Sequence, residues 1–258
     1  MALSYIDTHS HLYATDFEED VDDVLNSCKT NGVDIILLPA IDRSSFESMT
    51  QLVENHPKQV IPMMGLHPCS VKPETYKDEL AFVRDELSKG NYIAVGEIGM
   101  DLYWDKSTQE IQEEAFVKQC EWAIELDLPI AIHSRNATNE VIKLIQEVNN
   151  PKLTGVFNCF GDGILEANEI IDLGFMLGIG GVLTFKNSGL DKVISEVELE
   201  HLILETDSPY LAPSPYRGKR DESSYIPLIA EKLADVKRVS VTEVAEITTR
   251  NAKELFRI

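Results

Sequence analysis

The chain has 258 residues, of which 43% are hydrophobic and 26% are charged, a composition typical of globular proteins with a full core. Its formal net charge of −21 argues against a broad basic surface for long duplex nucleic acid, although it leaves room for a small positive patch inside one cleft. No run of eighteen apolar residues and no signal-peptide pattern occurs, so we expect a soluble, cytoplasmic protein with no membrane partner and no obligatory protein partner.

Eight short apolar runs predict β-strands. Their hydrophobic character is continuous rather than alternating, which is typical of parallel strands that are covered on both faces. In chain order the runs are Tyr5–Ile6, Val33–Leu38, Val60–Met64, Tyr92–Val95, Pro129–Ile132, Leu153–Phe157, Phe175–Ile179 and His201–Leu204.

Helical patterns lie between these runs. Residues Phe17–Thr30 place their apolar side chains on one face, and Asn31-Gly32 provides a stop. The segment Ser107-Thr108-Gln109-Glu110 has capping-box spacing and opens another predicted helix. Further helices are predicted at Val141–Val148, at Ile164–Leu173 and, as a pair, within Ile226–Phe256.

Strand and helix therefore alternate eight times, with about 32 residues in each unit, which matches the usual size of a (β/α)₈ TIM barrel. No linker or low-complexity tract interrupts the chain, so we expect one TIM-barrel domain over residues 1–258. A doubly wound open sheet is the rival architecture, but no G-x-G-x-x-G follows an early strand.

Histidines gather where the predicted strands end. His9 and His11 follow the first strand and, two residues apart in extended chain, point the same way. His67 follows the third strand and His133 follows the fifth. Because active sites of this barrel lie at the carboxyl ends of the strands, these four side chains are candidate site residues, and His9, His11 and His133 are candidate metal ligands. The remaining histidines, His56 and His201, lie elsewhere and are expected to be structural.

Two acids complete the pattern, since Glu97 follows the fourth strand and Asp207 follows the eighth. A mixed nitrogen and oxygen set suits Zn²⁺, Mn²⁺ or Mg²⁺ and offers no thiolate for a closed structural zinc site. A carboxylate such as Glu97 can bridge two ions, which activate water and clamp the oxygens of a phosphodiester. Metal-assisted hydrolysis follows from this ligand set as the reaction class. A serine nucleophile or a nucleotide-binding P-loop is less well supported, since no G-x-S-x-G elbow and no P-loop motif occurs.

Basic and aromatic side chains accompany these acids. Arg135 and the segment Arg217-Gly218-Lys219-Arg220 lie on predicted rim loops, where guanidinium groups suit phosphate oxygens. Four aromatic side chains on such loops either stack on bases or pack on the barrel top: Tyr103, Trp104, Tyr210 and Tyr216. The four cysteines are widely spaced and are expected to be reduced.

Taken together, these motifs resemble those of the TatD-type metal-dependent deoxyribonucleases. The matching segments are Ile6–His11, Gly65–Pro68, Val95–Asp101, Pro129–Arg135, Gly178–Gly181, Leu204–Pro213 and Arg217–Arg220. The resemblance runs through nearly the whole chain. It implies an amidohydrolase-like TIM barrel that hydrolyses phosphodiester bonds in DNA as a 3′→5′ exonuclease, with DNA ends or short single strands as substrate.

The resemblance also implies roles for individual residues. One metal would be held by His9, His11, Glu97 and Asp207, with Glu97 bridging to a second metal that His133 also binds. Asp207 would orient or deprotonate the attacking water, so that Asp207 and Glu97 are the candidate catalytic residues. His67 would sit near the substrate phosphate, and Arg135 joins it as a substrate-binding candidate because of its position.

One position departs from the family pattern. After the sixth strand the family usually has Phe-His-Cys-Phe, whereas this chain has Phe157-Asn158-Cys159-Phe160. An asparagine carbonyl can ligate a hard ion but replaces imidazole poorly on zinc. We therefore expect Asn158 to weaken the second metal site or to shift it toward Mg²⁺ or Mn²⁺, so that the chain binds one or two divalent ions.

Two alternatives to a deoxyribonuclease remain. The first is a metal-dependent hydrolase of another ester or amide, such as a small metabolite or an aminoacyl ester, to which the charge of −21 gives weight. The second is a non-catalytic protein that senses phosphate, an alternative motivated by Asn158.

Overall fold

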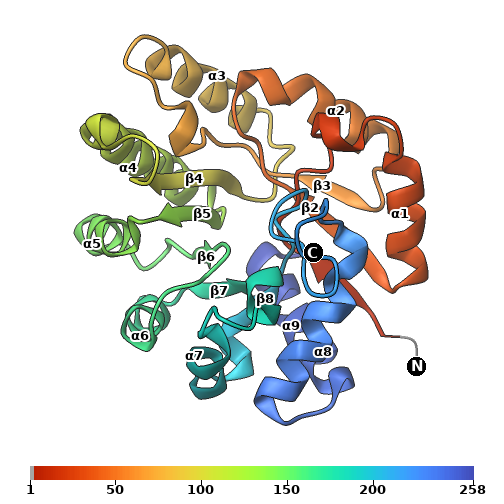
Figure 1. The fold of residues 1–258 in the computed structure, drawn as a ribbon. Helices are drawn as coiled ribbons and strands as arrows, with labels where there is room; N and C mark the ends of the chain where they lie inside the picture. Colours follow the sequence, from red (N-terminus) through yellow and green to blue (C-terminus); the bar gives the residue numbers. More distant parts are fainter. Residues whose placement is uncertain (1–2) are drawn as a thin grey trace.

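Within residues 3–258, which the computed structural model describes, eight parallel strands lie at the centre and helices surround them (Figure 1). The strands are β1 Tyr5–Asp7, β2 Val33–Leu38, β3 Val60–Pro62, β4 Val95–Asp101, β5 Ile130–Arg135, β6 Gly155–Phe157, β7 Met176–Ile179 and β8 Leu202–Leu204. Parallel strands need a crossover between them, and an α-helix lies between every two consecutive strands.

Two seams close the strands into a barrel. The ladders run β1-β2-β3 and β4-β5-β6-β7-β8. At the first seam, Met64 bridges to Val95, and its amide donates to the carbonyl oxygen of Ala94 at 3.2 Å. At the second, the Thr8 amide donates to the Leu204 carbonyl oxygen at 3.1 Å. The predicted (β/α)₈ barrel is therefore confirmed.

Nine α-helices form the outer layer of the described residues (Figure 1). They are α1 Val21–Thr30, α2 Phe46–Asn55, α3 Tyr76–Ser88, α4 Gln109–Leu126, α5 Thr138–Val148, α6 Ile164–Asp172, α7 Leu190–Glu196, α8 Ile226–Lys237 and α9 Val241–Phe256. None of these helices combines the length and the apolar character needed to cross a membrane.

Helix α1 illustrates how the sequence specifies the outer layer. Its buried side chains Val24, Leu25 and Cys28 lie on one helical face. Gly32 follows the helix with φ 78°, and a Cβ there would collide with the carbonyl of Leu3, so the stop requires glycine. The predicted start at Phe17 is wrong, because residues 15–17 form a short 3₁₀ turn before the helix.

The capping box predicted at Ser107 and Glu110 is also wrong. Asp105 accepts hydrogen bonds from the amide and the hydroxyl of Ser107, at 2.9 and 2.6 Å. A 3₁₀ turn over residues 106–108 follows, and α4 begins only at Gln109. The N-terminal cap is therefore the carboxylate of Asp105, and not Ser107 as predicted.

Strand β4 differs most from its prediction. It begins at Val95 rather than Tyr92 and continues to Asp101, so that Glu97 lies inside the strand. Gly99 pairs with His133 of β5, and a Cβ on Gly99 would strike the His133 backbone. The glycines and the buried acid interrupt the apolar pattern of this segment, so hydrophobicity alone predicts a loop after Val95. The pairing with β5 nevertheless makes the segment a strand.

A small apolar cluster joins residues of the strands to helix α9. It gathers Ile6, Leu37, Met63, Ala94, Ala131, Val156 and Ile203 with Ala252 and Phe256 of α9. Helix α9 contacts both β1 and β8. This packing leaves the carboxyl ends of the strands as the end of the barrel where polar side chains collect.

Candidate metal centre

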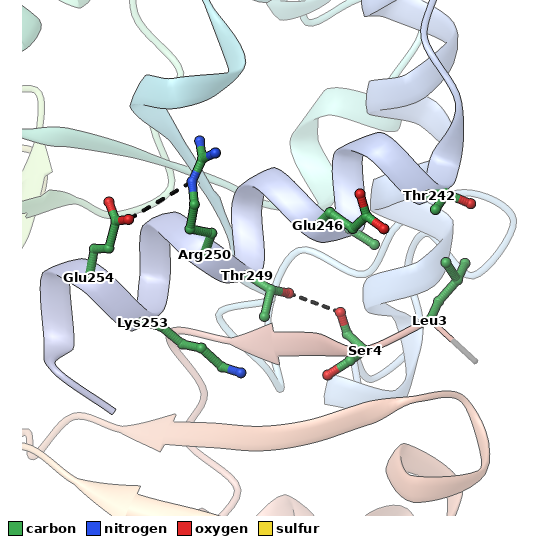
Figure 2. A pocket seen from close by; sticks show the side chains of 9 residues that line it. Leu3, Ser4, Thr242, Glu246, Thr249, Arg250, Lys253 and Glu254 are labelled. Atoms are coloured by element: carbon green, nitrogen blue, oxygen red, sulfur yellow. Dashed lines mark hydrogen bonds and ion pairs between the residues drawn. The ribbon is translucent and has the colours of Figure 1, made fainter. Parts of the chain in front are cut away.

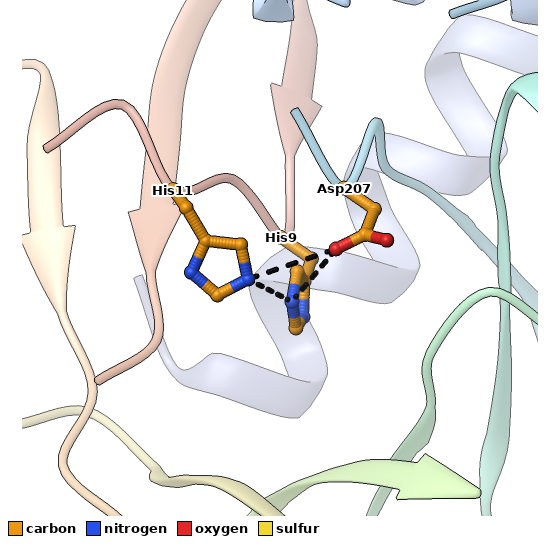
Figure 3. A group of neighbouring side chains, drawn as sticks. All are labelled: His9, His11 and Asp207. Atoms are coloured by element: carbon orange, nitrogen blue, oxygen red, sulfur yellow. Dashed lines mark hydrogen bonds and ion pairs between the residues drawn. The ribbon is translucent and has the colours of Figure 1, made fainter. Parts of the chain in front are cut away.

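His9, His11 and Asp207 converge where β1 and β8 end (Figure 3). The His9 and His11 imidazoles are buried, and their Nε2 atoms lie 3.3 Å apart. Asp207 has φ 67°, in the left-handed region, and its amide donates to the His9 carbonyl oxygen at 2.9 Å. The closing seam of the barrel therefore holds together residues from the two ends of the chain.

Glu97 of β4 completes this first group. Its Oε2 lies 3.3 Å from His9 Nε2 and 3.6 Å from His11 Nε2. Asp207 Oδ1 lies 3.5 and 3.6 Å from the same two nitrogens. Ligands about 2.0–2.1 Å from a tetrahedral ion stand about 3.4 Å apart, so these four atoms have the spacing that one divalent ion requires.

A tyrosine sets the tautomer of His11. The Tyr13 hydroxyl donates to the Pro39 carbonyl oxygen at 2.5 Å, so it can only accept from His11 Nδ1, which lies 2.7 Å away. The proton on Nδ1 leaves the lone pair of Nε2 facing the group. The sequence pattern does not single out Tyr13, whose only signal is its position two residues after His11.

His133 forms a second group with the same Glu97 carboxylate. Its Nδ1 lies 3.1 Å from Glu97 Oε1, and its Nε2 lies 3.0 Å from Asp101 Oδ2. Asp101 keeps the proton on Nε2 and leaves Nδ1 directed at Glu97. Because Glu97 Oε2 faces the first group and Oε1 faces His133, this carboxylate spans both positions. Asp101 is a second functional candidate that the sequence analysis passed over.

His67 also reaches this second group, with its Nε2 3.3 Å from His133 Nδ1 and 3.7 Å from Glu97 Oε2. By distance the three side chains could hold an ion. However, the Cys69 amide donates to His67 Nδ1 at 3.1 Å, so the proton of a neutral ring sits on Nε2. Burial lowers the pKa of His67 to about 4. This tautomer favours His67 as a neutral N–H donor directed into the site over His67 as a ligand.

Asn158 lies directly after β6, where its amide donates to the Ile132 carbonyl oxygen at 2.9 Å. Its side chain is buried, and neither its oxygen nor its nitrogen finds a hydrogen-bond partner among residues 3–258. A buried amide without partners is costly, which suits a group that meets an ion, water or substrate. Its role as a metal ligand stays a prediction.

Burial and charge shift several pKa values at the site. Burial acts to lower the pKa of His9, but the carboxylates of Glu97, Asp207 and Glu205 together outweigh it and raise the value to about 10. Burial likewise opposes protonation of His133, yet Asp101 and Glu97 raise its pKa to about 9. Burial raises the pKa of the Cys159 thiol well above its usual range, which argues against Cys159 as a nucleophile.

The basic residues proposed from the sequence are only partly available. Arg220 pairs with both carboxylate oxygens of Asp20, at 2.7 and 2.8 Å, and with Glu222 at 3.0 Å. The guanidinium of Arg220 is therefore already paired with carboxylates of the fold, which argues against a contact between Arg220 and a substrate phosphate. Arg135 is exposed, and its guanidinium carbon lies 3.9 Å from the ring centre of Tyr103.

The rim aromatics also divide into two kinds. Tyr216 stacks on Tyr225, with ring centres 4.4 Å apart and planes at 11°, so it packs within the fold. Tyr103, Trp104 and Tyr210 are exposed. These three remain able to meet a ligand.

A separate hollow of about 570 Å³ lies along α9 and beside Leu3 and Ser4, which precede β1 (Figure 2). The Thr249 hydroxyl donates to the Ser4 carbonyl oxygen at 2.9 Å across it. None of the clustered ligands lines this hollow. The hollow lies beside the residues that precede β1, whereas His9 and His11 follow the carboxyl end of β1. We therefore assign the chemistry to the carboxyl ends of the strands.

Comparison with known proteins identifies the family to which the chain belongs. A sequence profile described as TatD related DNase matches residues 6–257. The "uncharacterized metal-dependent hydrolase YabD" of Bacillus subtilis is 37% identical, over 98% of each chain. The human "deoxyribonuclease TATDN3" is 34% identical, over 98% of this chain and 95% of its own. The crystal structure of the Escherichia coli TatD homologue YJJV has a TM-score of 0.93 and 27% identity over the whole of both chains. The chain therefore belongs to the TatD family of metal-dependent hydrolases.

Proposed function

We propose that this protein is a metal-dependent deoxyribonuclease that removes nucleotides from DNA ends or short single strands in the 3′→5′ direction. The observation that carries the proposal is the group of four ligand atoms from His9, His11, Glu97 and Asp207. The two imidazole Nε2 atoms lie 3.3 Å apart, and each lies 3.3–3.6 Å from Glu97 Oε2 and Asp207 Oδ1. The second oxygen of Glu97 faces His133. The printed names of the family profile and of the human relative favour DNA as the substrate.

A divalent ion bound here, whether Mg²⁺, Mn²⁺ or Zn²⁺, would polarise a phosphoryl oxygen and lower the pKa of a bound water. Among the four side chains of the first group, Asp207 is the most exposed, at 22%, while the others are at 1–5%. Its carboxylate is therefore the member of the group that both faces the ligands and reaches solvent. We assign to Asp207 the orientation of the attacking water and the acceptance of its proton.

His67 and Arg135 are proposed to meet the substrate. The Nε2–H group of His67 can donate a hydrogen bond to a non-bridging phosphate oxygen. The neutral ring already carries this proton, so the ring does not have to be protonated first. Arg135 offers an exposed positive charge at the rim. The partnerless amide of Asn158 is positioned after β6, where a further hydrogen bond or a weak oxygen ligand to a second ion would satisfy it.

The proposal is tested with single-stranded oligonucleotides labelled at either end. We expect a ladder of products shortened from the 3′ end, abolished by a chelator and restored by Mg²⁺ or Mn²⁺. Asp207→Asn should lower the rate by about 10²–10⁴-fold, whereas the surface control His56→Gln should leave it unchanged. Undiminished cleavage in chelator, or by Asp207→Asn, would contradict the assignment.

A second candidate function is hydrolysis of another ester or amide on the same centre. The neutralisation of Arg220 by Asp20 and Glu222 favours it, because it removes one cation that DNA would use. A panel of carboxylic esters, amides and phosphodiesters, each with and without chelator, separates the two. Oligonucleotide binding without cleavage under every metal would instead support a non-catalytic, phosphate-sensing protein.

A further inference from the structure

Two loops that leave the metal centre carry exposed aromatic side chains. Tyr103 and Trp104, which follow β4, are 52% and 70% exposed, and Tyr210, which follows β8, is 57% exposed. Exposed apolar side chains that lie together, as Tyr103 and Trp104 do, mark binding surfaces more often than scattered ones. Both loops begin at residues already placed in the site, namely Asp101 and Asp207.

A single carboxylate ties the first aromatic pair to the centre. Asp101 Oδ1 accepts hydrogen bonds from the amides of Tyr103 and Trp104, at 2.9 and 3.2 Å. Its other oxygen holds His133 Nε2 at 3.0 Å. The aromatic pair therefore stands at a fixed offset from His133, one side chain away from the second ligand group.

Arg135 stiffens the pair from the side. Its guanidinium carbon lies 3.9 Å from the ring centre of Tyr103 and 5.4 Å from that of Trp104. The two rings meet edge to face, with centres 4.9 Å apart and planes at 87°. The guanidinium thus packs against the ring of Tyr103, whereas the ring of Trp104 remains largely exposed to solvent.

A hollow of about 240 Å³ lies against Trp104. Asp101, Asp105, Thr108 and Gln112 contribute polar walls to it, and Lys72 contributes a cation. Its lining also includes Pro68, the residue that follows His67. A flat aromatic wall with hydrogen-bonding groups around it suits a nucleobase.

We propose that Trp104 is the stacking site for a base of the bound single-stranded DNA, with Tyr103 and Arg135 as its rigid support. The proposal rests on the proposed function, because it takes the metal centre as the place where the phosphodiester lies. With a net charge of −21, the protein has little basic surface to hold a strand. Stacking is sequence-tolerant and needs no net charge, so it supplies the affinity that charge does not.

The test compares two oligonucleotides of equal charge, one with a normal 3′-terminal nucleotide and one with an abasic terminal residue. Terminal phosphorothioate linkages slow cleavage, and binding is measured by fluorescence anisotropy in Mg²⁺. We expect the normal end to bind the wild-type protein about tenfold more tightly. Trp104→Ala should bind both ends equally weakly, and Trp104→Phe should keep most of the difference.

Salt dependence separates stacking from charge. Trp104→Ala should leave the slope of log affinity against log salt unchanged, whereas Arg135→Gln should reduce its magnitude by about one. Arg84→Gln is the matched control, because Arg84 also lies over an aromatic ring, Trp122, but on the outer helices. In Trp122→Phe, the remaining tryptophan is Trp104, whose fluorescence should be quenched as the strand binds.

The outcomes distinguish this inference from the proposed function. Equal wild-type affinity for normal and abasic ends, or unchanged discrimination in a folded Trp104→Ala protein, overturns the stacking site even where DNA is hydrolysed. Discrimination by the wild-type protein that Trp104→Ala abolishes supports the stacking site even where no metal supports hydrolysis, an outcome that overturns only the nuclease. Failure to bind either oligonucleotide overturns the stacking site.

Discussion

Asp101 Oδ2 lies 3.0 Å from His133 Nε2 and thereby determines which imidazole nitrogen faces Glu97. The carboxylate itself is not directed at the first ligand group. Its effect on the centre is to orient a ligand and to raise the electron density on Nδ1, as outer carboxylates do in metal sites.

We expect Asp101→Asn to weaken metal binding by about 10–100-fold with the barrel intact, because the amide carries no charge and does not select the tautomer of His133. Isothermal titration calorimetry with Mn²⁺ measures the change. Asp105→Asn is the control, since Asp105 caps the turn before α4 and an asparagine caps equally well. Equal metal affinity of Asp101→Asn and wild-type protein would count against the role.

Tyr13→Phe removes the hydroxyl that accepts from His11 Nδ1 while keeping the ring. We expect metal affinity to fall by about tenfold, because His11 is then free to place its proton on Nε2. Tyr216→Phe serves as the control, because Tyr216 stacks on Tyr225 away from the ligands. A loss of thermal stability in Tyr13→Phe equal in metal-loaded and metal-free protein would point to a structural role instead.

Asn158→His tests the stoichiometry of the centre. We expect the wild-type protein to hold one ion tightly and a second one poorly, and the variant to hold two, because imidazole replaces an amide after β6. Plasma mass spectrometry of dialysed protein gives the metal content. His67→Gln should leave that content unchanged while slowing hydrolysis, since His67 is assigned as a donor. Two ions retained by dialysed wild-type protein would refute the weak second site.

Metal affinity should rise with pH. In the metal-free protein the pKa of His9 is about 10 and that of His133 is about 9, so both rings are protonated at pH 7. A protonated nitrogen cannot ligate, and binding must therefore release protons. Affinity is expected to increase as pH climbs toward 9–10 and to decrease in acid. Calorimetry in two buffers of different ionisation enthalpy counts the protons, and a count of zero at pH 7 would contradict these pKa values.

Asp221 should make the metal-free protein less stable in alkali. Burial raises its pKa to about 9, and the coordinates give its Oδ2 no hydrogen-bond partner among residues 3–258. The folded state then binds more protons than the unfolded state between pH 4 and pH 9, so stability falls as pH rises through that window. Asp221→Asn resembles the protonated form and should gain melting temperature relative to wild type at pH 9 more than at pH 5. An equal difference at both pH values would argue against the raised pKa.

The barrel was predictable from sequence because its strands are continuous apolar runs and its core needs little else. Val33–Leu38 matches β2 residue for residue. The carboxyl ends of the strands were harder to predict where they are polar. Glu97 and His133 lie within β4 and β5, but hydrophobicity alone predicts that each strand ends before these residues. That one domain spans residues 1–258 stays a prediction.

The candidate site shows the same division. Ligand types at the strand ends located the first group, because the barrel brings all carboxyl ends to one rim. Contacts between distant segments were invisible to the sequence, as with Arg220 and Asp20, which are 200 positions apart. The tautomers of His11 and His67 depend on Tyr13 and on the Cys69 amide, which only coordinates reveal.

The seam between β8 and β1 has a consequence for how the chain is held closed. Ser10 and Ser208, whose hydroxyl oxygens are 3.0 Å apart, are separated by 198 positions, and His9 and Asp207 meet beside them. An ion held by both residues would act as a reversible cross-link between the first and the last strand. Loading the protein should therefore slow amide exchange in β1 and β8 together, and metal supply would govern how long the molecule resists proteases that attack its opened ends.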